Sequence, residues 1–168
     1  GAFFPGLPPF AEEACRAALA NLAALVGLHE SLKAEGLPTL DIRIGLCTGE
    51  MLVGLVGSEQ KLEYTAMGDL VNLASRLEGA CKQYHIATLV NARCCELAKD
   101  RIVFREVDLI RVKGKALPTQ VFQVLGRQGG TLAIPDAALA AYNEGMALYK
   151  QRRWTEGCAA FERVLAAV

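Results

Sequence analysis

The stretch YTAMGDLVNLASRLEGACKQY, residues 64–84, carries the clearest periodicity of the chain. Its apolar residues recur at three- and four-residue spacing, which predicts an amphipathic helix over residues 70–84. At 100° per residue, one apolar stripe contains Leu70, Leu73, Ala74, Leu77 and Cys81. Asn72 and Arg76 are four residues apart and lie together away from that stripe. We expect Asp69 to be the N-cap of this helix.

The polar face of the helix, formed by Asn72 and Arg76, has two interpretations. In most amphipathic helices such residues are simply solvated. Asparagine, however, is a poor helix former that is more common near helix caps. The preceding loop also places the hydroxyl of Thr65 and a helix N-terminus nearby. A helix N-terminus, an amide and a guanidinium together suit an anionic ligand, so this face is a candidate anion site.

A second basic position is the run R-V-K-G-K at residues 111–115. In an expected strand, Ile110 and Val112 take one face while Arg111 and Lys113 take the other. Gly114 would let a ligand approach the backbone closely. The same alternation is also typical of a solvated edge strand, so both interpretations stay open.

Outward from these motifs, the sequence alternates between helical and extended patterns. We expect a helix over residues 11–34, a hairpin of strands 40–46 and 51–56, a polar loop over 58–69, a strand at 88–90, a short helix at 92–97, strands near 102–107, 109–113 and 119–125, and two short helices within 136–166. This order predicts an α/β (α+β) fold. A glycine-rich shift near residue 126 predicts one domain over 1–126, a linker over 127–135 and a helical hairpin over 136–168.

Bulk composition narrows the class of protein. The chain has 168 residues, of which 52% are apolar, enough to form a packed core. Its 18 basic and 18 acidic residues cancel, which argues against a nucleic-acid binder. No run reaches the roughly 18 apolar residues of a transmembrane helix. The six cysteines form no C-x-x-C pair, and we expect reduced, largely buried thiols in a cytosolic protein.

Three motifs together resemble one known family. They are IGLCTGEMLVGLVGS at residues 44–58, YTAMGDLVNLASRLE at 64–78 and VKGK at 112–115. Their order and spacing resemble the class III adenylate and guanylate cyclases, over about residues 11–126. The resemblance implies a ferredoxin-like nucleotide cyclase fold, incomplete at its N-terminal side. The helical hairpin after it resembles a partial tetratricopeptide unit.

The resemblance also implies an activity and roles for particular residues. The family converts ATP to 3′,5′-cyclic AMP and pyrophosphate, or GTP to cyclic GMP, with two Mg²⁺ or Mn²⁺ ions, as a head-to-tail homodimer. Asn72 matches the asparagine that orients the ribose, and Arg76 matches the arginine that stabilises the transition-state phosphate. Lys113 matches the lysine that contacts the triphosphate. Thr65 matches the base-reading position, which favours ATP over GTP.

The chain departs from the family pattern at its beginning. The family's two metal-binding aspartates precede the first helix, so we expect them upstream of residue 1 and expect no metal ligand in this chain. We therefore expect the chain alone not to cyclise ATP. The alternatives are a guanylate cyclase, or a non-catalytic cyclase-like module that regulates, binds nucleotide or dimerises. We also expect a protein partner for the tail. The expected location is cytoplasmic, either as a free protein or as the cytosolic part of a larger, membrane-anchored protein.

Overall fold

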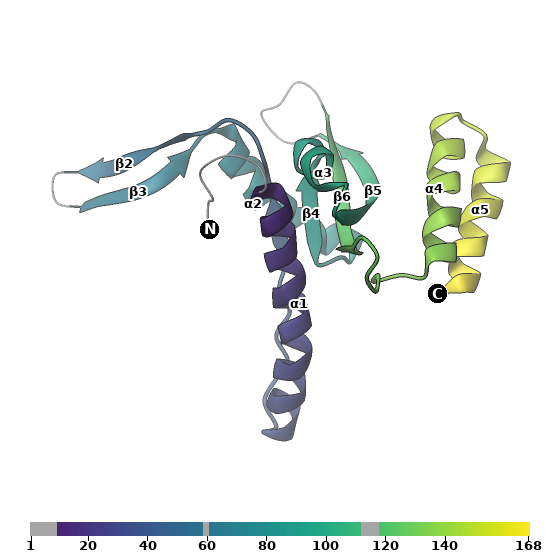
Figure 1. Ribbon diagram of the computed structural model, residues 1–168, viewed down its shortest axis with the longest axis horizontal. Helices are drawn as coiled ribbons and strands as arrows, with labels where there is room; N and C mark the ends of the chain where they lie inside the picture. The colour runs from purple at the N-terminus through teal and green to yellow at the C-terminus, as the bar shows by residue number, and fades with distance from the viewer. Residues whose placement is uncertain (1–9, 59–60, 112–117) are drawn as a thin grey trace.

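The computed structural model describes residues 10–58, 61–111 and 118–168 (Figure 1). The helices are α1 (Phe10–Ala34), α2 (Asp69–Tyr84), α3 (Ala92–Ala98), α4 (Asp136–Lys150) and α5 (Trp154–Ala167). The strands are β1 (Ile44–Leu46), β2 (Leu52–Ser58), β3 (Lys61–Met67), β4 (Thr88–Asn91), β5 (Ile102–Ile110) and β6 (Thr119–Arg127). The mixture of sheet and helices confirms the predicted α/β class, and the C-terminal helical hairpin is present.

Four strands form the central sheet, in the order β1-β4-β6-β5. Strand β1 runs parallel to β4, and the connection between them contains α2. Strand β6 is antiparallel to both β4 and β5. The β-α-β unit around α2 therefore holds this helix against the sheet, which places its polar face at a defined position.

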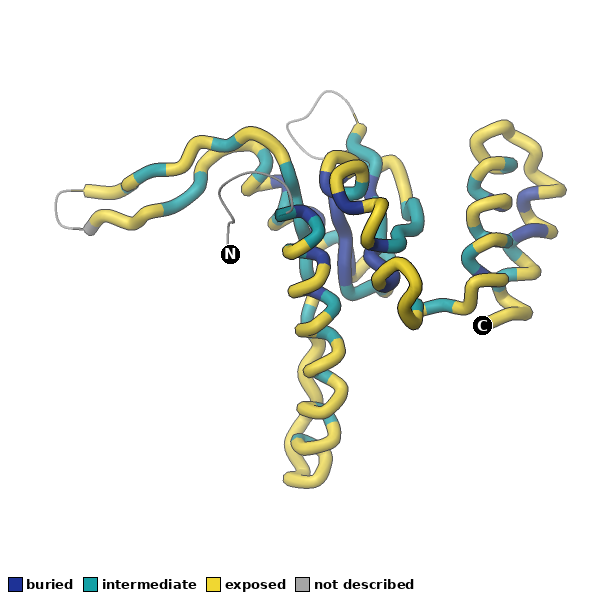
Figure 2. The backbone as a smooth tube through the Cα atoms, in the orientation of Figure 1, coloured by how far each residue is buried: buried dark blue, intermediate teal, exposed yellow. Residues whose placement is uncertain are grey.

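The core consists of two apolar clusters that meet the sheet through alternating residues of β4. Leu89 packs with Leu73, Leu77 and Cys81 of α2. Its neighbour Val90 packs instead with Cys15 of α1 and with Cys94 of α3. Successive strand residues point to opposite faces, so α2 covers one face of the sheet while α1 and α3 cover the other. Figure 2 shows the resulting buried centre at β4 and β6.

The buried thiols belong to this core. Cys15, Cys81 and Cys94 are fully buried, and the Sγ atoms of Cys15 and Cys94 lie 3.9 Å apart. The hydrogen bond with Cys94, together with burial, raises the pKa of the Cys15 thiol. Burial also raises the pKa of Cys95 to about 11. All six cysteines are free thiols, and three of them are buried, while Cys158 is exposed.

The predicted hairpin of strands 40–46 and 51–56 is wrong. Strand β1 pairs with β4, whereas β2 pairs with β3, which lies in the segment that the sequence predicted to be a polar loop. The resulting arm projects from the body and is exposed on both faces (Figures 1 and 2). Residues 61–66, KLEYTA, do alternate polar and apolar side chains, as a strand with one apolar face does, so the expectation of a polar loop overlooked a period-two signal.

Three smaller expectations also differ from the structure. Residues 40–43 are not part of β1, and the Leu40 side chain is 56% exposed. The strand expected at 102–107 and the start of the one expected at 109–113 form a single strand, β5, which has a bulge between Glu106 and Asp108 and ends at Ile110; residues 112–113 lie outside the described residues. The N-cap of α2 is Gly68 without a side-chain cap bond, so Asp69 is in the first turn instead.

The C-terminal hairpin pairs α4 with α5 through a close helix contact. A Cβ atom on Gly145 would lie 2.8 Å from the ring of Phe161, so the absence of a side chain there lets the helices approach. The rings of Tyr142 and Phe161 meet edge-on, with centroids 5.8 Å apart. Within the described parts of the chain, no helix combines the length and apolarity needed to cross a bilayer.

Candidate active site

Helix α2 presents Asn72 and Arg76 on its exposed side. Leu73, Leu77 and Cys81, which define the opposite side, are 2%, 0% and 0% exposed. The apolar stripe read from the sequence is therefore confirmed, and it fixes the rotation of the helix about its axis. Because Asn72 and Arg76 are one turn apart, their side chains share one patch of surface.

Strand β1 seats α2 through direct contact between backbones. A Cβ atom on Gly45 would overlap the carbonyl oxygen of Ala74 and lie 2.5 Å from the nitrogen of Glu78. Beside this contact, Arg43 Nε donates to Glu78 Oε1 at 3.0 Å. The Cys81 thiol also donates to the Ile44 carbonyl at 3.8 Å. The position of Asn72 and Arg76 is thus set by a glycine contact and by two polar contacts to the strand.

The start of α2 is fixed by the turn that leads out of the arm. Gly68 has φ 136°, which favours glycine, and its carbonyl accepts the amide of Val71 at 3.2 Å. Thr65 lies in β3, half-buried and paired with Gly54, shortly before this turn. The structure therefore places Thr65 on the segment that enters α2, on a different element from Asn72 and Arg76.

An open depression joins the far half of α2 to the end of β5. Its lining residues are Arg76, Gly79, Ala80, Lys82, Gln83, His85, Ile110 and Arg111. Three of these side chains carry positive charge, so the depression suits an anionic group. It brings Arg76 close to Arg111, but Asn72 and Thr65 are not among its lining residues. Lys113, the expected triphosphate contact, lies outside the described residues.

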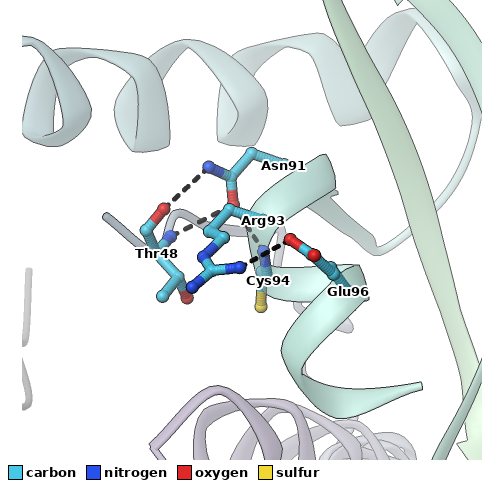
Figure 3. A network of polar contacts seen from close by, with 5 residues as sticks. All are labelled: Thr48, Asn91, Arg93, Cys94 and Glu96. Atoms are coloured by element: carbon cyan, nitrogen blue, oxygen red, sulfur yellow. Dashed lines mark hydrogen bonds and ion pairs between the residues drawn. The ribbon is translucent and has the colours of Figure 1, made fainter. Parts of the chain in front are cut away.

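Asn91 organises the other end of β1 and was missed by the sequence reasoning. Its Oδ1 accepts the amides of Thr48 at 3.1 Å and Cys94 at 3.2 Å, while its Nδ2 donates to the Thr48 carbonyl at 3.0 Å (Figure 3). One amide thereby caps α3 and clamps the loop between β1 and β2. An asparagine just before a helix was the available signal.

The loop that Asn91 clamps also touches the first turn of α2. A Cβ atom on Gly49 would lie 2.5 Å from Cδ1 of Leu70, and Gly49 has φ 158°. The hydrogen bonds of Asn91 to Thr48 therefore also help to position α2, because Gly49, next to Thr48, contacts Leu70 of that helix. Asn91 is only 7% exposed and has partners for both ends of its amide, as a buried polar side chain requires.

The described residues do not fit a metal centre. Within residues 10–58, 61–111 and 118–168, no group of three or more His, Cys, Asp or Glu side chains could hold a metal ion. The polar groups that gather at α2 are instead an amide and guanidinium groups, which donate hydrogen bonds. Guanidinium groups offer no acceptor, and a single amide oxygen supplies at most one metal ligand, so this set suits phosphate and hydroxyl groups.

Comparison with known proteins shows which family the chain resembles. A family model described as the adenylate and guanylate cyclase catalytic domain matches residues 5–126. Adenylate cyclase 1 of Rhizobium meliloti is 40% identical over 116 residues, which are 69% of this chain and 17% of the relative. The chain thus spans about a sixth of the length of that relative.

Two solved structures share the fold. The adenylyl cyclase CyaB from P. aeruginosa is 32% identical with a TM-score of 0.61, covering 72% of this chain and 63% of that chain. The non-canonical dimeric guanylyl cyclase domain of the RhoGC fusion protein from the aquatic fungus Blastocladiella emersonii is 26% identical with a TM-score of 0.50, covering 72% of this chain and 61% of that chain. The family match covers well over half of the residues. Two of the three motifs recognised in the sequence lie on β1, β2, β3 and α2, and VKGK lies outside the described residues. This chain belongs to the adenylate and guanylate cyclase catalytic domain family.

Proposed function

We propose that this chain provides the ribose- and phosphate-contacting part of an adenylate cyclase, which converts ATP to 3′,5′-cyclic AMP and pyrophosphate in intracellular signalling. One observation carries the proposal: α2 is seated on β1 so that Asn72 and Arg76 share its exposed face. The depression beside Arg76 contains a second arginine, Arg111, at the end of the strand that leads toward Lys113.

The reaction requires little of the protein besides positioning and charge. The ribose 3′-hydroxyl attacks the α-phosphorus, a new P–O bond forms, and the bond to pyrophosphate breaks. In the proposed arrangement, the Arg76 guanidinium donates to the oxygens on which negative charge develops. The Asn72 amide holds the ribose, Lys113 binds the triphosphate and Thr65 contacts the base.

Cyclases of this family generally use divalent metal ions. We propose that the complete domain uses two Mg²⁺ or Mn²⁺ ions. The described residues supply no metal-ligand cluster, so we assign no step of this mechanism to a metal ion.

We further propose that two cyclase domains assemble into a homodimer. Asn72 and Arg76 face away from the core of their own chain, and the arm formed by β2 and β3 exposes Leu52, Leu55 and Tyr64. The related fungal guanylyl cyclase domain is described as a non-canonical dimer, so it supports association of two domains but not a particular arrangement. A site at the interface would then combine these side chains with those of a second copy.

Thr65 favours ATP over GTP as the substrate. The resemblance assigns a cysteine to this position in guanylate cyclases, and a threonine hydroxyl offers a different hydrogen-bonding group to the base.

A guanylate cyclase and a non-catalytic nucleotide-binding module are the competing functions. Residues 1–126 are proposed as the cyclase domain, 127–135 as a linker and 136–168 as a tetratricopeptide-like unit that contacts a protein partner. The proposed location is cytoplasmic.

The test measures cyclic nucleotide formation by the full-length protein with ATP and GTP in parallel. We expect cyclic AMP to dominate, and we expect Arg76→Ala to lower kcat by about 10²–10³, the usual effect of removing one donor to the developing charge. Arg93→Ala is the control, because Arg93 lies on α3, is paired with Glu96 and is 54% exposed. Equal kcat for Arg76→Ala and wild type would contradict the role of Arg76. Absence of both products would favour the non-catalytic module.

A further inference from the structure

The pairing of β5 with β6 has two irregularities, and one of them lies between Glu106 and Asp108. Glu106 pairs with Phe122 and Asp108 pairs with Val121, so Val107 is an extra residue in the ladder. Such a bulge disrupts the ladder hydrogen bonds and changes the direction of the strand beyond it. Beyond this bulge, β5 continues to Ile110 and then to Arg111, both of which line the depression beside Arg76.

The C-terminal hairpin contacts β5 at the bulge. The Tyr142 hydroxyl of α4 donates to the Glu106 carbonyl at 2.8 Å. The Lys150 ammonium of the same helix lies 2.6 Å from Glu106 Oε2, and the Glu106 side chain is only 19% exposed. The Arg105 guanidinium lies 5.0 Å from the centre of the Tyr142 ring, and Arg105 also donates to Gln123 of β6 at 2.6 Å. Tyr142 and Lys150 therefore hold the strand where its own ladder is broken.

On the other side of the bulge, the strand contacts α2. The Tyr84 hydroxyl, in the last turn of α2, donates to Asp108 Oδ2 at 2.6 Å. Glu106 and Asp108 are thus held from two directions, by the tail and by the helix that carries Asn72 and Arg76. Figure 1 shows β5 between these elements at the edge of the sheet.

The segment between β6 and α4 keeps the hairpin close to the sheet. The amide of Ala133 donates to the Leu125 carbonyl at 2.9 Å. A Cβ atom on Gly126 would lie 2.8 Å from the Thr131 carbonyl oxygen and 2.9 Å from Leu132. This segment folds back onto β6, so the start of α4 is held near the sheet by the connecting segment as well as by its own contacts with β5.

We propose that the C-terminal hairpin is a positioning element of the nucleotide site, which acts through the β5 bulge. Tyr142 and Lys150 hold Glu106 in place at the bulge, and the bulge sets the direction of the strand toward Arg111. Asp108, on the other side of the bulge, is hydrogen-bonded to Tyr84 and so connects the strand to α2. The family match ends at residue 126, so these tail contacts lie outside the family pattern. The inference rests on the proposed cyclase function, because Tyr142 would act on the proposed nucleotide site through β5.

The test compares Tyr142→Phe with wild type in the full-length protein. Removal of the hydroxyl leaves the ring and its contacts with Phe161 and Arg105 in place. We expect kcat for cyclic AMP formation to fall about threefold to thirtyfold, with the KM for ATP within about twofold. Tyr149→Phe is the matched control, because Tyr149 is on the same helix but is 56% exposed and packs on Trp154.

Hydrogen exchange supplies a readout that does not require activity. In Tyr142→Phe we expect faster exchange in β5 and in the last turn of α2, and no such change in Tyr149→Phe. Lys150→Met and Glu106→Gln, combined in a double-mutant cycle, should be non-additive in kcat, because the two side chains form one ion pair.

The outcomes separate the two proposals. A wild-type protein without cyclase activity overturns the proposed function, while the exchange data still decide whether the tail restrains β5. An active wild type with unchanged kcat in Tyr142→Phe overturns the positioning role. Faster exchange confined to α4 and α5 overturns it as well, because the hydroxyl would then stabilise only the hairpin.

Discussion

At the scale of single residues, Gly45 has the most direct effect on the candidate site. It is the point where β1 and α2 touch through backbone atoms, and Asn72 and Arg76 are on the far side of that helix. Sequence periodicity identified the polar face, because a 3.6-residue repeat is a local property. It gave no signal for Gly45, since the requirement for glycine arises only when strand and helix come together.

Gly45→Ala should destabilise the fold strongly. The added methyl group meets the Ala74 carbonyl and the Glu78 nitrogen, and backbone atoms cannot move aside as a flexible side chain can. We expect a loss of about 3 kcal/mol or more in the free energy of unfolding, at the upper end for overpacking. Urea unfolding measures it. Gly54→Ala is the control, because no atom lies within 4 Å of its new Cβ; an equal loss in both variants would contradict this account.

Tyr84 links stability to alkaline pH. Burial and the hydrogen bond to Asp108 raise the pKa of Tyr84 from 10.0 to about 12. A hydroxyl with a raised pKa contributes stability that is complete below its unfolded pKa and is lost as pH rises through the folded value. We therefore expect the stability difference between wild type and Tyr84→Phe to be constant up to about pH 10 and to shrink between pH 10 and 12.

Denaturant melts at several pH values measure that difference. Tyr149→Phe, treated identically, corrects for general alkaline destabilisation of the chain. A wild-type advantage over Tyr84→Phe that persists unchanged at pH 12 would show that the Asp108 hydrogen bond is not its source.

At the scale of elements, the contact between α4 and α5 shows how a glycine can be required inside a helix. Gly145 is buried, and its Cβ position lies 2.8–2.9 Å from three ring atoms of Phe161. An alanine in a helix interior normally gains up to about 1 kcal/mol over glycine. Here that gain competes with overpacking, which costs about 1–3 kcal/mol.

Gly145→Ala should therefore destabilise the hairpin, by about 1 kcal/mol net. Gly79→Ala provides the opposite case, because Gly79 is within α2 and nothing lies within 4 Å of its Cβ position. We expect Gly79→Ala to stabilise the protein by about 0.5–1 kcal/mol. Thermal unfolding of both variants tests the pair, and stabilisation by Gly145→Ala would mean that the Phe161 ring yields without cost.

Elements differed in how well the sequence predicted them, for physical reasons. All five helices were expected, because each carries its own periodicity. The pairing of strands was not, since β1 finds its partner β4 more than 40 residues later, and the alternating residues of β3 lie in a segment whose many polar residues indicated a loop. The donors around Asn91 and the contact of Tyr142 with Glu106 join separate elements, so no local pattern could reveal them.

At the scale of the whole molecule, the candidate site is open on one side. Asn72 and Arg76 are exposed, and the arm of β2 and β3 leaves the body without covering them. The arm has one apolar face, formed by Val53, Leu55, Leu62 and Tyr64, whose side chains are 36–67% exposed. An apolar face that its own chain leaves uncovered is typical of an interaction surface. We infer that a second copy covers it in the proposed homodimer.

Leu55→Glu should weaken that dimer. Leu55 is 67% exposed and lies opposite Tyr64 in the arm, so a carboxylate there would be buried without a partner on association. We expect the dimer dissociation constant of the full-length protein to rise at least about tenfold, as at an interface hot spot, and cyclic AMP formation at low protein concentration to fall with it. Sedimentation velocity across a concentration series measures the constant.

Leu165→Glu, at an 80% exposed leucine of α5, is the control for an added charge. An unchanged dissociation constant in Leu55→Glu would show that the arm is not part of the interface. Because the site takes side chains from both copies in this arrangement, Arg76→Ala chains mixed with Leu55→Glu chains should not restore wild-type activity, whereas independent monomeric sites would contribute in proportion to their numbers.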